Sequence, residues 1–242
     1  MGVLEDALWR LRTAVDEVVE AATKDDKTPL MNQPALRQFG ERLVQGKGLD
    51  LSVDGGSEIV PGVLAYGDIN NFKAFNSRHS HDVADLALNA VGVQLLAIAE
   101  LCNGRAFRRS GDEFVLLLPA SGIEVAVAEI ASRMNHLEVD LRGTSPSGDA
   151  IDVVTLSFGF AKTGNDLTLT DLLQRAERAC DVAKRRGPGV MLEWDASMEK
   201  EAPVDVRGRC SSCGTTVSLA IPPERVMTTG YPCPVCAGPL PR

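Results

Sequence analysis

The feature that most constrains the fold is a pair of strand-like runs joined by a two-residue turn. In "RAFRRSGDEFVLLLP", residues 105–119, Gly111 next to Asp112 suits a tight hairpin between the two runs. A buried strand is predicted upstream in "EIVPGVLAYGD", followed by a core helix in "HDVADLALNAVGVQLLAIAELC". A helix near residues 125–135, a strand in "DVVTLSFGFA" and a helix in "TDLLQRAERACDVAKRR" follow. The order βαββαβ, with added helices, predicts an α+β fold.

Composition excludes several classes of function. The 242 residues are 44% hydrophobic and carry a net charge of −8, and the longest basic block is "KRRG" at residues 184–187. A surface that neutralises nucleic-acid phosphates is therefore not expected. Glu100, Pro119 and Glu124 interrupt the apolar runs before they reach the length of a membrane helix, and the first residues lack the pattern of a signal peptide. We expect a soluble, cytoplasmic protein with no membrane partner.

An N-terminal helix carries apolar residues at heptad spacing. The series contains Leu4, Leu8, Leu11, Val15, Val18 and Ala22. Such a seam predicts pairing with a second copy of the chain, and an amphipathic helix lying on its own domain explains the short pattern equally well. We expect this helix at residues 1–24, an α+β domain at 25–193, a linker at 194–206 and a small second domain at 207–242.

Three carboxylates are predicted to meet at one edge of the sheet. Asp68 ends the first strand, and Asp112 and Glu113 occupy the hairpin turn. Neighbouring carboxylates repel one another unless a cation lies among them, and hard oxygen ligands suit Mg²⁺ or Mn²⁺ better than Zn²⁺. Taken alone, a Gly-Asp-Glu tripeptide is also typical of a solvated hairpin tip.

Five segments together resemble the GGDEF family of diguanylate cyclases. "RRSGDEF" is similar to the signature of that family, with Ser110 in place of its first glycine. "DINNFKAFNSRHSHDVADLAL" resembles the family pattern D-I-D-x-F-K-x-I-N-D-x-x-G-H-x-x-G-D-x-x-L. "TPLMN", "LSFGFA" and "LLQRAERACDVAKRRG" resemble the opening, strand and closing motifs of the domain. The resemblance spans roughly residues 20–190, with the motifs in the family order.

This resemblance implies a ferredoxin-like, palm-type nucleotide cyclase fold and the synthesis of cyclic di-GMP from two GTP molecules in a homodimer. It implies that Asp68, the Ile69 carbonyl, Asp112 and Glu113 hold Mg²⁺ or Mn²⁺, and that Glu113 assists metal binding or activates the ribose 3′-hydroxyl. Asn76 and Asp85 would hydrogen-bond the guanine edge, and Lys184 would contact phosphate. The remaining nucleotide-binding positions that it implies are Phe72, Lys73, Ser110 and Gly111.

Several departures from the family pattern leave alternatives open. Ser110 replaces a glycine whose bare backbone lies against the nucleotide, and Asn70 stands where the family often has a second aspartate. An inactive GTP-binding regulatory or interaction module is one alternative. A relative of the CRISPR-type palm polymerases, making a different cyclic nucleotide, is another. A third makes the C-terminal segment the functional part and the cyclase-like domain its dimerising platform.

Two CxxC pairs near the C-terminus predict a zinc ribbon. The pairs are Cys210 with Cys213 and Cys233 with Cys236, separated by nineteen residues. Four thiolates at this spacing suit a tetrahedral structural Zn²⁺ site, and two disulfides are the alternative in an oxidising compartment. The segment between the pairs has one arginine and one aromatic residue, so we expect a protein partner rather than nucleic acid for the ribbon.

Overall fold

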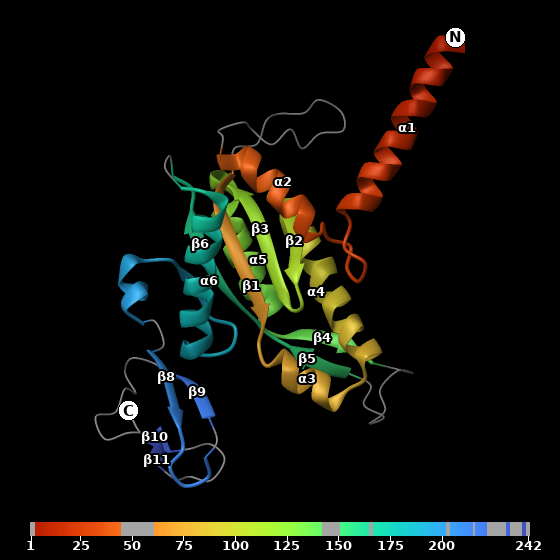
Figure 1. Ribbon diagram of the computed structural model, residues 1–242. Coiled ribbons are helices and arrows are strands. Elements are labelled where there is room, and N and C mark those ends of the chain that lie inside the picture. Colours follow the sequence, from red (N-terminus) through yellow and green to blue (C-terminus); the bar gives the residue numbers. More distant parts are fainter. Residues whose placement is uncertain are drawn as a thin grey trace. The chain divides into compact units, whose positions relative to one another are not determined.

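The computed structural model describes residues 3–44, 61–141, 151–164, 167–201, 204–214, 216–221, 231–232 and 239–240. The chain divides into two compact units, Met1–Trp194 and Asp195–Arg242. The larger unit has the predicted α+β architecture, in which helices cover a five-stranded sheet (Figure 1).

The larger unit contains more elements than the sequence pattern predicted. In chain order they are α1 (Val3–Thr23), α2 (Gln33–Val44), β1 (Pro61–Ile69), α3 (Phe72–Arg78), α4 (His81–Leu101), β2 (Arg105–Ser110), β3 (Glu113–Pro119), η1 (Ala120–Gly122), α5 (Ile123–Met134), β4 (Leu137–Asp140), β5 (Ile151–Val154), β6 (Leu156–Lys162), α6 (Leu169–Arg186) and β7 (Met191–Glu193). The short strands β4 and β7 were not predicted.

The central sheet has the strand order β2-β3-β1-β6-β7. Strand β1 runs antiparallel to both β3 and β6, and β7 runs parallel to β6. The predicted hairpin is confirmed, because β2 and β3 pair antiparallel across Gly111 and Asp112. Strand β1 is thus central, and the residues at its end lie beside both β3 and β6.

Alternate residues of β1 build two apolar cores. Val63 and Ala65 belong to the core that contains α4 and α5, whereas Leu64 and Tyr66 belong to the core that contains α2 and α6. Side chains two positions apart on a strand share a face, so Asp68 follows Tyr66 onto the α6 side. Helix α6 packs closely against this face of the sheet at Gly159 of β6. A Cβ atom at that position would collide with the α6 backbone, so only glycine fits there.

The single strand predicted in "DVVTLSFGFA" is wrong, because the structure divides it at Thr155. Strand β5 pairs with β4 in a separate two-stranded sheet, and β6 joins the central sheet. The Thr155 carbonyl accepts a hydrogen bond from the Asn70 N–H at 2.8 Å, and its hydroxyl accepts one from Asn70 Nδ2 at 3.0 Å. These bonds hold the bend between β5 and β6. The sequence does not indicate this bend, because strand-forming residues run through it without a break.

Helix α4 is the core helix that the sequence predicted. Its first turn is capped by the Ser80 hydroxyl, which accepts from the Val83 N–H at 3.4 Å. Among the described helices it is the one long and apolar enough to cross a membrane, and half of its most apolar window is buried in the domain. The buried residues are Val83, Ala84, Ala87, Leu88, Val91, Gly92, Leu95, Ile98 and Ala99.

The smaller unit consists of short elements. They are η2 (Ala196–Glu201), β8 (Val204–Arg209), β9 (Thr216–Ile221), β10 (Tyr231–Pro232) and β11 (Pro239–Leu240). Strands β8 and β9 form one antiparallel pair, and β10 and β11 form another. Cys210 and Cys213 lie between β8 and β9, whereas Cys233 and Cys236 fall outside the described residues.

Candidate active site

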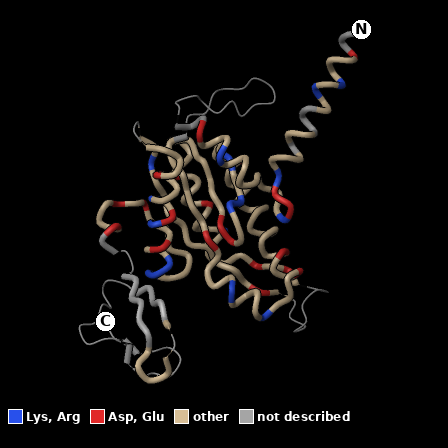
Figure 2. Tube along the Cα trace, viewed as in Figure 1, with Lys and Arg blue, Asp and Glu red and all other residues tan. Residues whose placement is uncertain are grey.

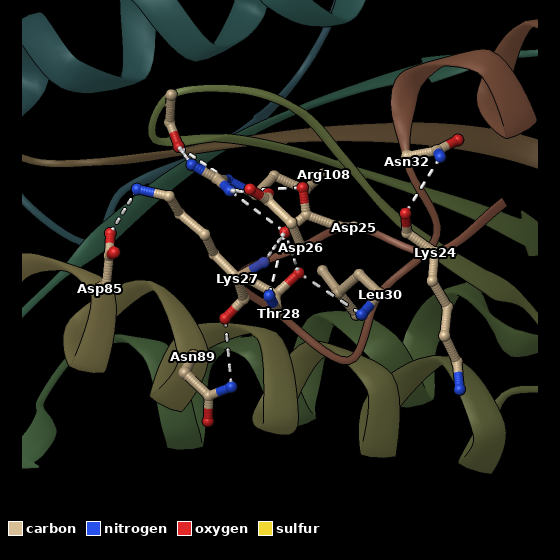
Figure 3. Close-up of polar contacts among 11 residues, drawn as sticks. Lys24, Asp25, Asp26, Lys27, Thr28, Leu30, Asn32, Asp85, Asn89 and Arg108 are labelled. Atoms are coloured by element: carbon tan, nitrogen blue, oxygen red, sulfur yellow. Dashed lines mark hydrogen bonds and ion pairs between the residues drawn. The ribbon is translucent and has the colours of Figure 1, made fainter. Parts of the chain in front are cut away.

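The hairpin turn between β2 and β3 is held in place by a buried arginine. Gly111 has a φ of +49°, a left-handed conformation that glycine adopts without strain. Arg108 donates to the Gly111 carbonyl from Nε at 2.9 Å and from Nη2 at 2.8 Å. Its Nη1 donates to Asp25 Oδ1 at 3.1 Å, in the loop between α1 and α2 (Figure 3). Arg108 therefore fixes the turn relative to that loop.

Strand pairing brings the three predicted carboxylate residues to one end of the sheet. Asp68 of β1 lies opposite Glu113 of β3 in the antiparallel register. The Ile69 N–H donates to the Asp112 carbonyl at 3.3 Å, which joins the end of β1 to the hairpin turn. Acidic segments accordingly mark both the end of β1 and the β2–β3 turn in Figure 2.

Lys184 provides a positive charge to this carboxylate cluster. It lies in the last turn of α6, and its Nζ is 2.6 Å from Asp68 Oδ1. Burial raises the pKa of Asp68 to about 6, with smaller contributions from Asp112 and Glu113, although Lys184 acts to lower it. Burial would lower the pKa of Lys184, but the contact with Asp68 raises it above its usual value. The Lys184 ammonium therefore compensates the charge of Asp68.

The donor chemistry of this cluster fits a hard divalent cation. Carboxylate and backbone carbonyl oxygens are the ligands that Mg²⁺ and Mn²⁺ prefer, and Asp68, Asp112, Glu113 and Ile69 offer both kinds. In the described ranges, no three acidic, histidine or cysteine side chains are grouped as a metal site. The ammonium of Lys184 is the cation beside Asp68 in this arrangement.

The side chain of Arg109 joins Tyr66, Glu177 and Glu113 in a polar network that was not predicted from the sequence. Arg109 Nη1 donates to the Tyr66 hydroxyl and to Glu177 Oε2, both at 3.1 Å, and lies 3.7 Å from Glu113 Oε2. Burial, with Glu113 and Glu177 nearby, raises the pKa of the Tyr66 hydroxyl, so it remains protonated. The sequence signal for this network is Tyr66, a single tyrosine in an apolar strand. It is two positions before Asp68 and therefore on the same face of the strand.

Ser110 makes a specific contact in place of the family glycine. Its Oγ donates to Glu113 Oε2 at 2.6 Å. The hydroxyl therefore restrains the carboxylate that the sequence resemblance assigns to metal binding or to activation of the 3′-hydroxyl. An ideal Cβ at the adjacent Gly111 would meet no atom within 4 Å, so Gly111 is required for its backbone conformation rather than for space.

The predicted base-binding residues lie on α3 and at the start of α4. Phe72 is buried and its ring stacks on Phe75, with the centroids 6.0 Å apart, whereas Lys73 is exposed. The Oδ1 atom of Asn76 is buried without a hydrogen-bond partner among the described residues. An unsatisfied buried oxygen costs free energy, which is consistent with a place for a ligand donor. Figure 1 shows α3 directly beyond the end of β1 that carries Asp68.

Asp85, the second predicted base-binding residue, already has a protein partner. Its Oδ1 lies 2.7 Å from the Nζ of Lys27, in the loop between α1 and α2 (Figure 3). Each of the two side chains is 40% exposed, so the pair is accessible to a ligand. Lys27 was not among the residues that the sequence singled out.

The first CxxC pair is described and the second is not. Cys210 is buried and Cys213 is exposed. The Gly214 N–H donates to the Cys210 carbonyl at 2.9 Å, and Gly214 has a φ of +73°, as a tight turn after the pair requires. A four-cysteine site remains a prediction, because Cys233 and Cys236 lie outside the described residues.

Comparison with known proteins agrees with the fold and identifies the family. The family model described as "Diguanylate cyclase, GGDEF domain" matches residues 22–189. The diguanylate cyclase VdcA of Vibrio cholerae is 29% identical over 122 residues, which cover 50% of this chain and 35% of VdcA. The response regulator PleD of Caulobacter vibrioides is 30% identical over 187 residues, which cover 75% of this chain and 38% of PleD. The chain thus spans little more than a third of either relative.

Solved structures show the same fold. The coiled coil and GGDEF domain of DgcB from Caulobacter crescentus, in complex with c-di-GMP, has a TM-score of 0.60 and 26% identity. That match covers 78% of this chain and 94% of the DgcB chain. The diguanylate cyclase SiaD of Pseudomonas aeruginosa, in complex with its activator SiaC, has a TM-score of 0.58 and 23% identity, covering 78% of this chain and 69% of SiaD.

Proposed function

This chain belongs to the GGDEF family of diguanylate cyclase domains, and from that premise we propose that it condenses two molecules of GTP into cyclic di-GMP and two pyrophosphates. Each ribose 3′-oxygen bonds to the α-phosphorus of the other nucleotide, and the bond from that phosphorus to the pyrophosphate breaks. The observation that carries the proposal is the register of β1 against β3, which sets Asp68 opposite Glu113 beside the turn that contains Asp112. Lys184 adds a cation to the same cluster. An acidic site of this kind, next to a group that can bind phosphate, suits nucleotidyl transfer.

In the proposed mechanism, Asp68, the Ile69 carbonyl, Asp112 and Glu113 hold the metal. A divalent cation held there would supply positive charge to the phosphates and would lower the pKa of the attacking hydroxyl. Release of the Lys184 ammonium from Asp68 makes it available to a phosphate oxygen. Glu113 would accept the proton of the ribose 3′-hydroxyl once the hydrogen bond from Ser110 is released, and Arg109 lies beside its carboxylate. Asn76 and Asp85 hold the base, so that the reacting groups are aligned.

The reaction as proposed requires two copies of the domain, because each binds one GTP and the product contains two. Helix α1 offers an apolar surface for pairing: Leu8, Leu11 and Val18 are 57%, 63% and 68% exposed in the single chain. Since such exposed side chains gain free energy when a second copy covers them, we propose that α1 mediates a homodimer. Leu11→Asp should shift sedimentation from dimer to monomer, and an unchanged dimer would refute this role of α1.

We propose a structural Zn²⁺ site for Cys210, Cys213, Cys233 and Cys236, with the ribbon contacting a protein partner. The support is the CxxC spacing and the turn at Gly214, which closes the first pair. Thiolate ligands of this kind persist in a reducing compartment, so the proposed location is the cytoplasm. Elemental analysis should find one zinc per chain, reduced by Cys210→Ser; a zinc-free folded protein would refute the site.

A second candidate function rests on the Ser110–Glu113 hydrogen bond. A carboxylate that is already engaged by a neighbouring hydroxyl at 2.6 Å is less free to ligate metal or to accept a proton. If this bond persists when GTP binds, the chain is a GTP-binding regulatory module rather than a cyclase. A different cyclic product would instead favour the relationship to the palm polymerases.

The test is incubation of the purified chain with GTP, ATP or both, plus Mg²⁺ or Mn²⁺, followed by mass spectrometry. Cyclic di-GMP supports the cyclase, and a mixed or adenine-containing product supports the polymerase-like alternative. GTP binding without product identifies the regulatory module. Absence of both binding and product would contradict every nucleotide-based proposal and direct attention to the C-terminal unit.

A further inference from the structure

Lys27 contacts the predicted base-binding helix through both its side chain and its backbone. Its Nζ lies 2.7 Å from Asp85 Oδ1, and its carbonyl accepts from Asn89 Nδ2 at 3.2 Å. Asp85 and Asn89 are four residues apart on α4 and therefore lie on one face of the helix. Figure 3 shows the side chain of Lys27 directed toward Asp85, while Lys24 in the same loop is directed away from it.

The loop that carries Lys27 is also tied to the hairpin turn. Asp25 Oδ1 accepts from the Thr28 N–H at 3.0 Å and from the Thr28 hydroxyl at 2.8 Å. It also accepts from Arg108, which binds the Gly111 carbonyl. The Lys27 N–H also donates to Asp25 Oδ1, at 3.2 Å, so one chain of hydrogen bonds connects the Lys27 backbone to the turn that contains Asp112.

The Lys27–Asp85 pair matches the hydrogen-bonding edge of guanine. Guanine presents an acceptor at O6 beside donors at N1 and at its amino group. A carboxylate can accept from both donors, and an ammonium next to it can donate to O6. Adenine reverses the pattern, because it presents an amino donor in place of O6 and a bare acceptor at N1. The pair would therefore oppose both groups of adenine.

We propose that Lys27 is a specificity-determining residue that donates to guanine O6 while Asp85 binds the two guanine donors. This inference rests on the proposed GTP-binding function of the domain. The lysine ammonium has three N–H donors, and the contact with Asp85 uses one of them. Lys27 thus remains able to donate to a base that approaches Asp85.

The ion pair by itself is not needed to hold the loop. Both side chains are 40% exposed, and exposed ion pairs contribute little to stability. Asp25 and Asn89 anchor the loop through other bonds. Replacement of the Lys27 ammonium should therefore leave the fold intact and change only the recognition of the base.

The test measures binding of 3′-deoxy-GTP, 3′-deoxy-ITP and 3′-deoxy-ATP, which lack the attacking hydroxyl, to the full chain with Mg²⁺. Lys27→Met should weaken binding of the two nucleotides that carry O6 by about tenfold, the scale of one charge-assisted hydrogen bond at a half-exposed site. Binding of the adenine nucleotide should be unchanged or stronger. Lys24→Met, the same substitution in the same loop, should match the unmodified chain.

Equal or tighter binding of 3′-deoxy-GTP by Lys27→Met would overturn the inference and make the ion pair a structural tie or a competitor for Asp85. An equal loss for all three nucleotides would also overturn it, since the effect would not depend on O6. If the unmodified chain binds none of them, the proposed function fails as well. Thermal unfolding shows whether the methionine variant is folded. If it is not, Lys27→Gln serves instead, because its amide retains N–H donors and it should lose less affinity.

Discussion

The proposed nucleotide site has two halves, a proposed metal-binding half at the sheet edge and a proposed base-binding half at the start of α4, and they are built in different ways. In the metal-binding half, Asp68 and the hairpin acids are fixed by strand pairing, and the Asp68 side chain is only 13% exposed. In the base-binding half, Lys27 and Asp85 meet between a loop and a helix surface, each 40% exposed. Buried charge must be compensated, whereas exposed charge is already solvated by water. The positions of the acids at the sheet edge are therefore constrained by the fold, whereas single substitutions can change the side chains of the base-binding half without disturbing it.

This contrast assigns chemistry and specificity to different parts of the structure. Loss of an acid at the sheet edge should remove metal binding and turnover without altering the choice of base. Loss of a charge at the helix surface should alter affinity and base selection without altering the rate of the chemical step. Four substitutions, ordered by the size of the expected effect, test this difference between the two halves.

The largest effect is expected for Asp68→Asn. Loss of one carboxylate ligand should lower the rate of product formation by about a thousandfold, because metal-ion stabilisation of the transferring phosphate is worth several kcal/mol. Initial rates of pyrophosphate release at saturating GTP and Mg²⁺ provide the measurement. Asp26→Asn, in an exposed side chain of the α1–α2 loop, is the control. A rate within threefold of the unmodified chain would show that β1 does not position the catalytic metal.

Lys184→Met should produce the next largest effect. Turnover is expected to fall by about tenfold to a hundredfold, because the variant lacks the proposed cation for phosphate. In metal-free buffer the pKa of Asp68 should rise further above about 6, since the contact with Lys184 favours the ionised carboxylate. Carboxyl NMR of the labelled chain measures this pKa. An unchanged or lower value would contradict the role of Lys184 as the compensating cation.

Asp85→Ala should weaken GTP binding by about tenfold to thirtyfold while leaving the maximal rate within threefold, because the base-binding half acts on affinity. The matched control is Asp82→Ala, an exposed acid in the first turn of the same helix. Steady-state kinetics separates KM from kcat. A fall in kcat with an unchanged KM would place Asp85 in the chemistry and break the division between the two halves.

The smallest effect is expected for Ser110→Gly. Removal of the 2.6 Å hydrogen bond to Glu113 should raise turnover by about threefold to fivefold, the scale of one neutral-to-charged bond in a half-exposed site. Ser110→Ala, which keeps the Cβ atom, separates loss of the hydroxyl from relief of crowding. An unchanged or lower rate in the glycine variant would show that Ser110 does not limit the reaction.

Much of the fold was predictable because its signals are local. The Gly111-Asp112 turn and the apolar runs beside it predict the hairpin, and the long apolar pattern predicts α4. The bend between β5 and β6 was missed, because Thr155 is held by Asn70, 85 positions earlier in the chain. Strands β4 and β7 have only four and three residues, too few for alternation of polar and apolar residues to show.

The acids of the site were predictable, and their partners were less so. An aspartate at a strand end and acids in a hairpin turn are visible in the sequence, and the structure brings them to one sheet edge. Lys27 and Asp85 are 58 positions apart, and Arg109 and Tyr66 are 43 apart. The first pair forms where the α1–α2 loop packs on α4, and the second where β1 and β2 join one sheet, so no local spacing indicates either pair.

The most direct test of the account is mass spectrometry of the products formed from GTP and Mg²⁺ by the purified chain and by Asp112→Ala. Cyclic di-GMP is expected from the unmodified chain and none above background from the variant, because in the proposed mechanism the acids at the end of β1 and in the β2–β3 turn hold the catalytic metal. Cyclic di-GMP at equal rates from both would contradict that assignment. GTP bound by the unmodified chain with no cyclic product would contradict the proposed cyclase activity.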